Sequence, residues 1–182
     1  MSFLYKTNYF PILTGDWLCV SNNDGHSQSV AEAMDENGTL IANTVYGSTY
    51  SPSNSYIVAN TVSASAGDVQ LGAVFQNDIG YVVLNNITIN TQAGQAPTVN
   101  MAGESVEDGA TATCTYSLPA FALAVTHHAQ ILFSAFTLAG TGCYLQSASY
   151  TASATVTKAT REGTPLSHDV SQARIDAQLT IT

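Results

Sequence analysis

The stretch YLQSASYTASATVTK, residues 144–158, decides the fold class. Its even positions carry mainly tyrosine, alanine and valine, whereas its odd positions, apart from Leu145, are serine and threonine. An alternation of period two puts one kind of side chain on each face of a β-strand. The stretch therefore predicts a strand with one apolar face and one hydroxylated face.

A second alternation follows after a break at residues 162–165, with apolar residues at the odd positions of 174–181. Together the two stretches predict a long antiparallel hairpin over residues 144–182. At about 3.3 Å per residue, its first strand would approach about 50 Å. That exceeds the usual strand length, so this strand either bends between sheets or projects as an arm.

β signals recur through the rest of the chain. A hairpin is predicted from about Ser27 to Tyr46, around a turn at Asp35-Glu36-Asn37-Gly38, because Asn-Gly favours the positive φ of tight turns. The only helix candidate is the alanine-rich segment 121–129, which follows Pro119. Further strands are expected at 56–64, 69–75, 81–89, 98–101, 110–118 and 131–138.

The pattern as a whole predicts an all-β protein: an antiparallel β-sandwich or small barrel with a long C-terminal hairpin and at most one short helix. At 182 residues and 45% hydrophobic residues, the chain is expected to form a single β domain over 1–182. An N-terminal arm (1–15) and the extended hairpin (144–182) are its expected extensions.

Charge is scarce and mostly negative. Charged residues make up 9% of the chain, the net charge is −9, and the only basic residues besides histidine are Lys6, Lys158, Arg161 and Arg174. Nucleic-acid binding and attraction to anionic membranes both depend on lysine and arginine. We therefore expect no direct nucleic-acid binding and no membrane binding.

The cysteines and the N-terminus point away from a secreted disulfide scaffold. Cys19, Cys114 and Cys143 are widely spaced and odd in number, which favours buried small side chains; one disulfide with one cysteine left over stays open. No signal peptide follows Met1, and no apolar run of about 18 residues is present. We expect a protein made in the cytoplasm, or one that is already processed, without a transmembrane segment.

Two groups of residues are candidates for metal binding. The first is His127-His128, with the distant His26 and His168; neighbouring residues on a strand point to opposite faces, so surface histidines are the favoured interpretation. The second is the oxygen-rich segment 21–25 (Ser-Asn-Asn-Asp-Gly). It lacks the spaced acidic series of a calcium loop and is favoured as a turn after a strand at 17–20.

One acidic cluster is a candidate for catalysis. Glu104, Glu107 and Asp108 could supply paired carboxylates, but they lie between Gly103 and Gly109 and are favoured as a solvated turn. No nucleophile elbow, phosphate-binding loop or zinc motif is present. We therefore predict no catalytic, metal-binding or cofactor-binding residue, no cofactor, and a protein that is not an enzyme.

Tyrosines gather around one serine-rich segment. Tyr46, Tyr50 and Tyr56 flank residues 51–55 (Ser-Pro-Ser-Asn-Ser), which reads as a loop. Exposed tyrosines in a loop could contact a partner or a sugar ring. Tyrosines of the core and of a sheet edge are the favoured alternative.

In its low charge, its many serines, threonines, alanines and asparagines, and its nearly continuous β pattern, the whole chain resembles virion structural proteins of tailed bacteriophages, the tail-tube type most closely. The resemblance implies a self-assembling structural protein whose partners are further copies of itself and other structural proteins, located in the virion. It carries over no functional residue. The alternative function is a β-sandwich binding module for a carbohydrate or a cell-surface ligand.

Overall fold

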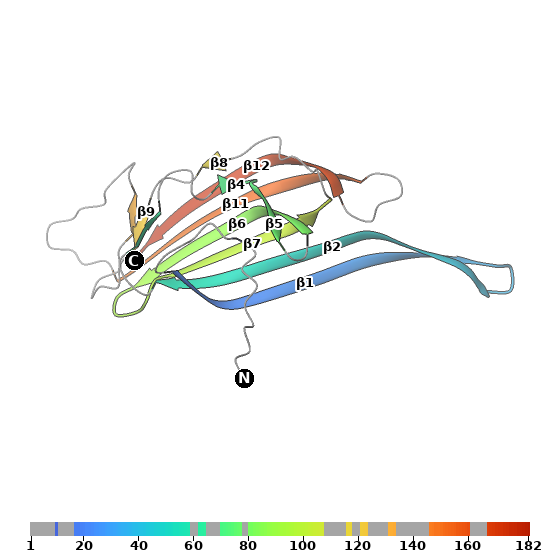
Figure 1. The fold of residues 1–182 in the computed structure, drawn as a ribbon, viewed down its shortest axis with the longest axis horizontal. Helices are drawn as coiled ribbons and strands as arrows, with labels where there is room; N and C mark the ends of the chain where they lie inside the picture. Colours follow the sequence, from blue (N-terminus) through green and yellow to red (C-terminus); the bar gives the residue numbers. More distant parts are fainter. Residues whose placement is uncertain are drawn as a thin grey trace.

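The computed structural model describes residue 10 and residues 17–58, 62–64, 70–77, 80–107, 116–117, 121–123, 131–133, 146–160 and 167–182. Every regular element in these residues is a β-strand, and none of them is helical, so the all-β prediction is confirmed (Figure 1). The strands are β1 (Trp17–Met34), β2 (Leu40–Val58), β3 (Val62–Ala64), β4 (Gln70–Leu71), β5 (Val74–Asn77), β6 (Gly80–Gln92), β7 (Thr98–Val106), β8 (Tyr116–Ser117), β9 (Phe121–Leu123), β10 (Ile131–Phe133), β11 (Ser147–Thr160) and β12 (Ser167–Ile181).

One large open sheet dominates the fold. Its strand order is β1-β2-β7-β6-β11-β12, with β5 beside one end of β6, and each neighbouring pair is antiparallel. The strands β10-β9-β3 and β4-β8 form two small further sheets. Among the described strands, β1 and β12 are therefore the two edges of the large sheet.

The predicted C-terminal hairpin is present as β11 and β12. Its register runs from Ala148 opposite Ile181 to Thr160 opposite Ser167. The expected alternation is confirmed on β11, because its apolar residues from Ala148 to Ala154 are buried while the serines and threonines between them are only partly buried. A register shift between Thr155 and Val156 then changes the alternation near the end of the hairpin.

The predicted hairpin around Asn37-Gly38 is also confirmed, and it is longer than expected. The N–H of Gly38 donates to the carbonyl of Asp35 (3.0 Å), and Gly38 has a φ of 78°. The Asp35 carboxylate accepts hydrogen bonds from the N–H groups of Asn37 (2.9 Å) and Thr39 (2.7 Å). Asp at the first position of a type I turn and a left-handed glycine after it are the usual chemistry of a three-residue hairpin loop.

Two expected turns are wrong, because both lie inside long strands. Residues 21–25 continue β1, and residues 51–55 continue β2; the two segments pair with each other, as in Asp24 opposite Pro52. Register shifts at Cys19/Ser21 and Ser27/Ser29 let the strands continue through turn-forming residues. Strand pairing and burial here override local propensity.

The helix expected at 121–129 is wrong over its described part. Residues Phe121–Leu123 form β9, which lies between β3 and β10, and residues 124–130 lie outside the described residues. Of the expected N-terminal arm, only Phe10 is described. Most of the expected strand 110–118 and residues 134–138 also lie outside the described part.

The turn expected from Gly103 is wrong as well, because β7 continues to Val106. A Cβ on Gly103 would lie 2.5 Å from the carbonyl oxygen of Val83 and 3.0 Å from the ring of Phe10. Glycine is needed here for close packing, and it does not mark a turn. Gly72, with a φ of 85°, does break the strand expected at 69–75 into β4 and β5.

The core lies against one face of the large sheet. Phe10 is fully buried there, and its ring meets Phe75 edge to face at 6.1 Å. The buried cluster also contains Tyr56, Leu71, Val82, Leu84, Ile87, Ile89, Val99, Met101, Tyr150, Ala152 and Ala154. At the two edges of the sheet Cys19, Ile175 and Leu179 pack against this cluster and are only partly buried.

Candidate interaction surfaces

The β1–β2 hairpin extends well past the other strands of the sheet (Figure 1). The pairing of β2 with β7 ends at Ser53 opposite Ala102. One further hydrogen bond, from the N–H of Tyr50 to the hydroxyl of Ser105 (2.8 Å), ties β2 to β7. Beyond Tyr50, β1 and β2 pair only with each other among the described strands, and we call residues 27–49 the distal hairpin.

A histidine and a tyrosine stack where the distal hairpin meets the sheet. His26 lies opposite Tyr50 in the strand register, and their rings stack with centroids 4.4 Å apart. The Nε2 atom of His26 also lies 3.1 Å from the hydroxyl of Ser48. These contacts link β1 to β2 at the root of the distal hairpin.

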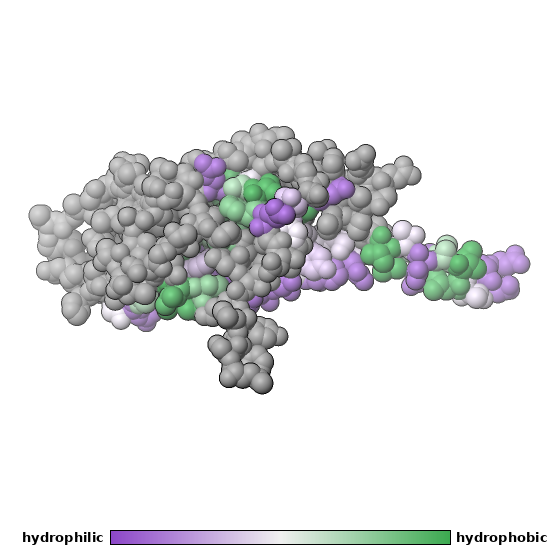
Figure 2. Space-filling view, in the orientation of Figure 1, coloured by the Kyte–Doolittle hydropathy of each residue, from purple (hydrophilic) through white to green (hydrophobic). Residues whose placement is uncertain are grey.

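Large apolar side chains are exposed along the distal hairpin, and Figure 2 shows them as green groups on the projecting part. Val30 lies directly opposite Val45, and Met34 lies opposite Leu40. Ile41 is the most exposed, at 66%. All seven large hydrophobic residues exposed in the described part of the chain lie on β1 and β2: Leu18, Val20, Val30, Met34, Leu40, Ile41 and Val45.

The exposure of these apolar side chains is energetically unfavourable for an isolated chain. A two-stranded hairpin is marginally stable in water unless a third strand or another surface covers it. Contiguous exposed apolar side chains mark interaction surfaces in soluble proteins. The eight residues of β1 in the distal hairpin span about 25 Å. This length and the exposed apolar side chains are features of a docking element.

The opposite face of the sheet is polar where β2, β7, β6 and β11 lie side by side, whereas at the other end of β6 a small apolar cluster around Val83 and Val106 is buried on it. Hydroxyl and amide side chains hydrogen-bond across neighbouring strands: Ser55 donates to Asn100 (2.6 Å), and Ser149 donates to Asn90 (2.7 Å). Thr88 and Thr151 are 3.4 Å apart on the same face. These bonds join β2 to β7 and β6 to β11, and they use neutral groups only.

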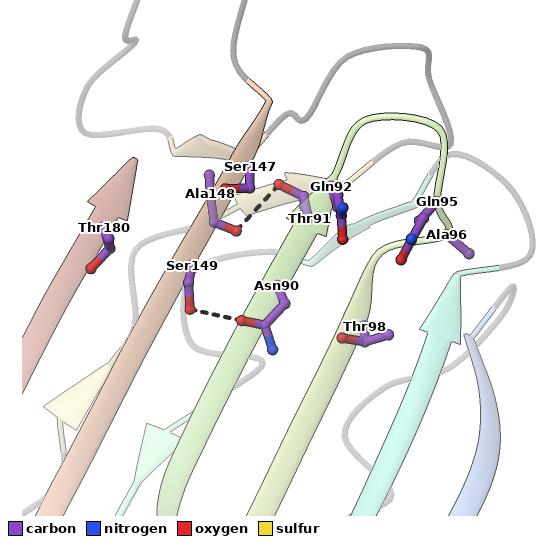
Figure 3. Close-up of a pocket in the computed structure, with 10 residues that line it drawn as sticks. All are labelled: Asn90, Thr91, Gln92, Gln95, Ala96, Thr98, Ser147, Ala148, Ser149 and Thr180. Atoms are coloured by element: carbon purple, nitrogen blue, oxygen red, sulfur yellow. Dashed lines mark hydrogen bonds between the residues drawn. The ribbon is translucent and has the colours of Figure 1, made fainter. Parts of the chain in front are cut away.

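Two shallow hollows lie along this polar surface. The first has a volume of about 340 Å³ and lies at the end of β6, β7 and β11 (Figure 3). Figure 3 shows hydroxyl and amide groups around it, with no charged or aromatic side chain: Asn90, Thr91, Gln92, Gln95, Ala96, Thr98, Ser147, Ala148, Ser149 and Thr180. The second, about 370 Å³, is lined by Thr151, Ser153, Asp176, Ala177 and Gln178.

The residues weighed as metal ligands are not brought together. Asp24 and His26 lie on β1, His168 lies on β12 at the other edge of the sheet, and His127 and His128 lie outside the described residues. Among the described residues, no group of three or more histidine, cysteine or acidic side chains could hold a metal ion. Glu104 lies on β7 opposite Val83, Glu107 directly follows β7, and Asp108 lies outside the described part.

The three clustered tyrosines have separate positions. Tyr56 is 1% exposed, and its hydroxyl donates to the carbonyl of Phe10 (3.1 Å). Burial raises the pKa of the Tyr56 phenol above its usual range, and the nearby Cys19 raises it further. Tyr50 stacks on His26, and Tyr46 lies on β2 opposite Ser29. No loop presents these tyrosines together, and Tyr56 is a core tyrosine, as the favoured interpretation predicts.

The cysteine prediction is tested at one position only. Cys19 on β1 is a free thiol, and the amide of Asn54 donates to its sulfur (3.4 Å). It is partly exposed at the sheet edge, so it is not the fully buried side chain that was favoured. Cys114 and Cys143 lie outside the described residues.

Sequence reasoning missed the distal hairpin as a projecting element. The signal was present: Val30-Ala31 and Ala33-Met34 precede the turn, and Leu40-Ile41-Ala42 follow it. Apolar residues on consecutive positions of a strand occupy both of its faces. A hairpin that is apolar on both faces cannot have a solvated face, so it needs cover from elsewhere.

No protein-family model matches the chain, and no curated protein matches it significantly. Within the described residues, no helix is long and apolar enough to cross a membrane.

Proposed function

We propose that this protein is a non-enzymatic structural protein that assembles with further copies of itself and with other structural proteins. The observation that carries the proposal is the distal hairpin. It places five large apolar side chains in solvent, outside the part of the sheet that has a core. Such a hairpin gains stability when another chain covers it.

Two more features support assembly. The large sheet is open, and its edge strands β1 and β12 are 18 and 15 residues long. Long sheet edges are templates for pairing with another chain unless they are blocked. The scarcity of charge, 9% of the residues, leaves few of the side chains that proteins use to block edges.

The proposed place of this assembly is the virion of a tailed bacteriophage, where the protein would be a tail component. The support is the charge-poor, hydroxyl-rich and nearly all-β sequence, together with the docking features above. Antibodies against the chain, applied to particles purified from its source, are expected to label the tail. Labelling of cell envelopes with none on particles would contradict the virion assignment.

The mass of the purified protein tests self-assembly directly. Light scattering at about 10–100 µM should give several times the chain mass of 19.1 kDa, and negative-stain microscopy of the same sample should show regular particles. The double variant Met34→Gln/Ile41→Gln should reduce the assembled fraction, since it removes apolar area from the distal hairpin. Asn43→Gln/Thr44→Gln, at exposed polar positions of the same hairpin, is the matched control.

A wild-type protein that stays at 19.1 kDa over this range would contradict self-assembly. An equal effect of the apolar variant and its control would show that the exposed side chains do not drive association.

A second candidate function is favoured by the hollow in Figure 3. Its volume of about 340 Å³ and its neutral hydroxyl and amide lining suit a sugar ring of a neutral carbohydrate. Calorimetric titration with a panel of neutral oligosaccharides should then give heat that is lost in Asn90→Ala. No heat at millimolar ligand would remove this candidate.

A further inference from the structure

The exposed apolar side chains of the distal hairpin continue one face of the large sheet. Tyr56 lies on the core face of β2, and Tyr50, an even number of residues before it on the same strand, shares that face. His26 stacks on Tyr50 from β1. Both register shifts of the distal hairpin place their extra residue on β2, so β1 alternates regularly from His26 to Met34. Val30 and Met34 therefore lie on the side that continues the core face.

The partners of these two residues on β2 complete an apolar surface. Val45 lies opposite Val30, and Leu40 lies opposite Met34. We call these two opposed pairs the apolar stripe. Each of its four side chains is 45–58% exposed. The core face of the sheet therefore continues onto the distal hairpin as an exposed apolar surface.

One carboxylate interrupts the apolar stripe. Glu32 lies midway between Val30 and Met34 on β1, so its side chain leaves the strand on the same face. Asn43, a neutral residue, lies opposite it. Figure 2 shows hydrophilic side chains between the green groups of the projecting part. A partner chain that covers both apolar pairs therefore covers Glu32 as well.

The other titratable groups of the hairpin and its root lie beyond the ends of the stripe or out of phase with it: Asp24, His26, Asp35, Glu36 and Tyr46. Residues 17–58 contain no lysine or arginine. On these two strands, the nearest group that could carry a positive charge is His26, six residues or about 20 Å along β1 from Glu32. Glu32 is therefore not neutralised by its own hairpin.

A second copy of this chain has few cations to place against Glu32. The chain carries four lysines and arginines against 13 acidic residues. Arg174 is the only one of the four whose side chain the structure describes, and its guanidinium is bonded to Asp176 (2.8 Å). A carboxylate that is covered without a cation is destabilised in its charged form and gains a proton. Covering the stripe is therefore easier when Glu32 is protonated.

We infer that self-assembly through the distal hairpin is proton-dependent, with the Glu32 carboxyl taking up one proton for each apolar stripe that another copy covers. The inference rests on the proposed self-assembly and adds its regulation. An exposed glutamate loses its proton above about pH 4.3, whereas a covered carboxyl keeps it at higher pH. Acidification therefore strengthens the contact, by up to about 10-fold for each pH unit, and alkaline pH weakens it.

The pH dependence of assembly, measured on the wild type and on Glu32→Gln, tests this inference. Light scattering from about pH 5.5 to about pH 8.5 stays above the isoelectric point of about 4.4. The apparent dissociation constant of the wild type should fall as the pH is lowered. Glu32→Gln keeps the shape of the side chain and removes its charge, so at the alkaline end it should lower the dissociation constant at least about 10-fold. The dissociation constant of this variant should change much less with pH than that of the wild type.

The matched control is Glu36→Gln, which removes the same charge at an exposed position of the turn, outside the stripe. In about 0.15 M salt it should change the dissociation constant at most about 3-fold and keep the wild-type pH dependence, since distant exposed charges are screened. Circular dichroism at each pH establishes that the variants are folded. Equal effects of the two substitutions would overturn the inference, because they would reflect net charge alone. Weaker assembly of Glu32→Gln would also overturn it, because a cation of the partner would then face Glu32.

A direct proton count gives a second reading. Dilution calorimetry in two buffers of different ionisation enthalpy should show that each dissociating contact releases about one proton in the wild type and close to none in Glu32→Gln. Equal proton counts for the two proteins would contradict the role of Glu32. A wild type that stays at 19.1 kDa at every pH would instead refute the proposed self-assembly.

Discussion

The ring of His26 stacks on the ring of Tyr50 at a centroid distance of 4.4 Å and an interplanar angle of 18°. The two residues face each other across β1 and β2, one residue away from the start of the distal hairpin. The N–H of Tyr50 is also the last described hydrogen-bond donor from β2 to β7. This stacked pair therefore lies where the pairing of β2 with β7 ends. On one side of the pair β2 has a neighbouring strand at each edge, and on the other side β1 and β2 pair only with each other among the described strands.

We expect Tyr50→Ala to loosen the distal hairpin without unfolding the sheet. Stacked aromatic pairs contribute about 0.5–1.5 kcal/mol beyond the area they bury. Amide exchange in residues 27–49 of the dilute protein should rise by up to about 10-fold, while exchange in β6 and β7 stays unchanged. Tyr50→Phe keeps the stacking and is the control; an equal rise in that variant would show that the ring contact is unimportant.

We expect Tyr56→Phe to destabilise the protein by about 1–2 kcal/mol near neutral pH, because it removes the hydrogen-bond donor to the buried carbonyl of Phe10. Urea denaturation of the two proteins measures this difference. An unchanged free energy of unfolding would mean that the carbonyl of Phe10 finds another donor.

The same variant has a consequence at alkaline pH. Burial raises the pKa of the Tyr56 phenol, so the folded state keeps its proton where the unfolded chain, with a tyrosine pKa of about 10, loses it. The contribution of Tyr56 to stability is complete below about pH 10 and falls as the pH rises toward the raised folded pKa. The advantage of the wild type over Tyr56→Phe should therefore shrink above about pH 10. An advantage that grows with pH would contradict the assigned direction.

We expect Gly103→Ala to cost about 1–3 kcal/mol or more in the free energy of unfolding. Its Cβ would lie 2.5 Å from the backbone oxygen of Val83 and 2.8 Å from a methyl group of Val82, and a backbone atom has little room to move. Gly25→Ala is the matched control on an edge strand, because its Cβ would be 3.6 Å from the nearest atoms of Ser51. Equal thermal midpoints for the two variants would show that the packing at Gly103 relaxes.

We expect Arg174→Ala to leave the stability of the fold almost unchanged. Arg174 is bonded to Asp176 at 2.8 Å, but the two side chains are 73% and 54% exposed. Exposed ion pairs contribute about 0–1 kcal/mol, so the unfolding midpoint should barely change. A loss of stability as large as that of Gly103→Ala would contradict a surface role.

The distribution of hydroxyl and apolar residues in 144–158 was enough to predict one strand and its two faces, since side-chain direction on a strand follows from backbone geometry alone. The Asp35–Gly38 turn was predictable for a similar local reason: glycine takes the positive φ there, and the Asp35 side chain satisfies nearby N–H groups. The acidic charge balance and the scarcity of lysine and arginine are likewise properties of composition.

Segments 21–25 and 51–55 mark the limit of that reasoning. Their serine, asparagine, glycine and proline residues favour turns locally, yet each segment is held extended by pairing with the other, which is 28 residues away in the sequence at Asp24 and Pro52. The turn predicted from Gly103 was wrong for the same reason. The atoms that leave no room for a Cβ there belong to Val83, Val82 and Phe10, which are distant in the sequence. The sequence alone determined the fold class, the hairpins and the charge. Only the tertiary structure decided where the pairing of β2 with β7 ends. That end point separates the apolar residues of the core from those exposed on the distal hairpin, because burial depends on neighbours that are distant along the chain.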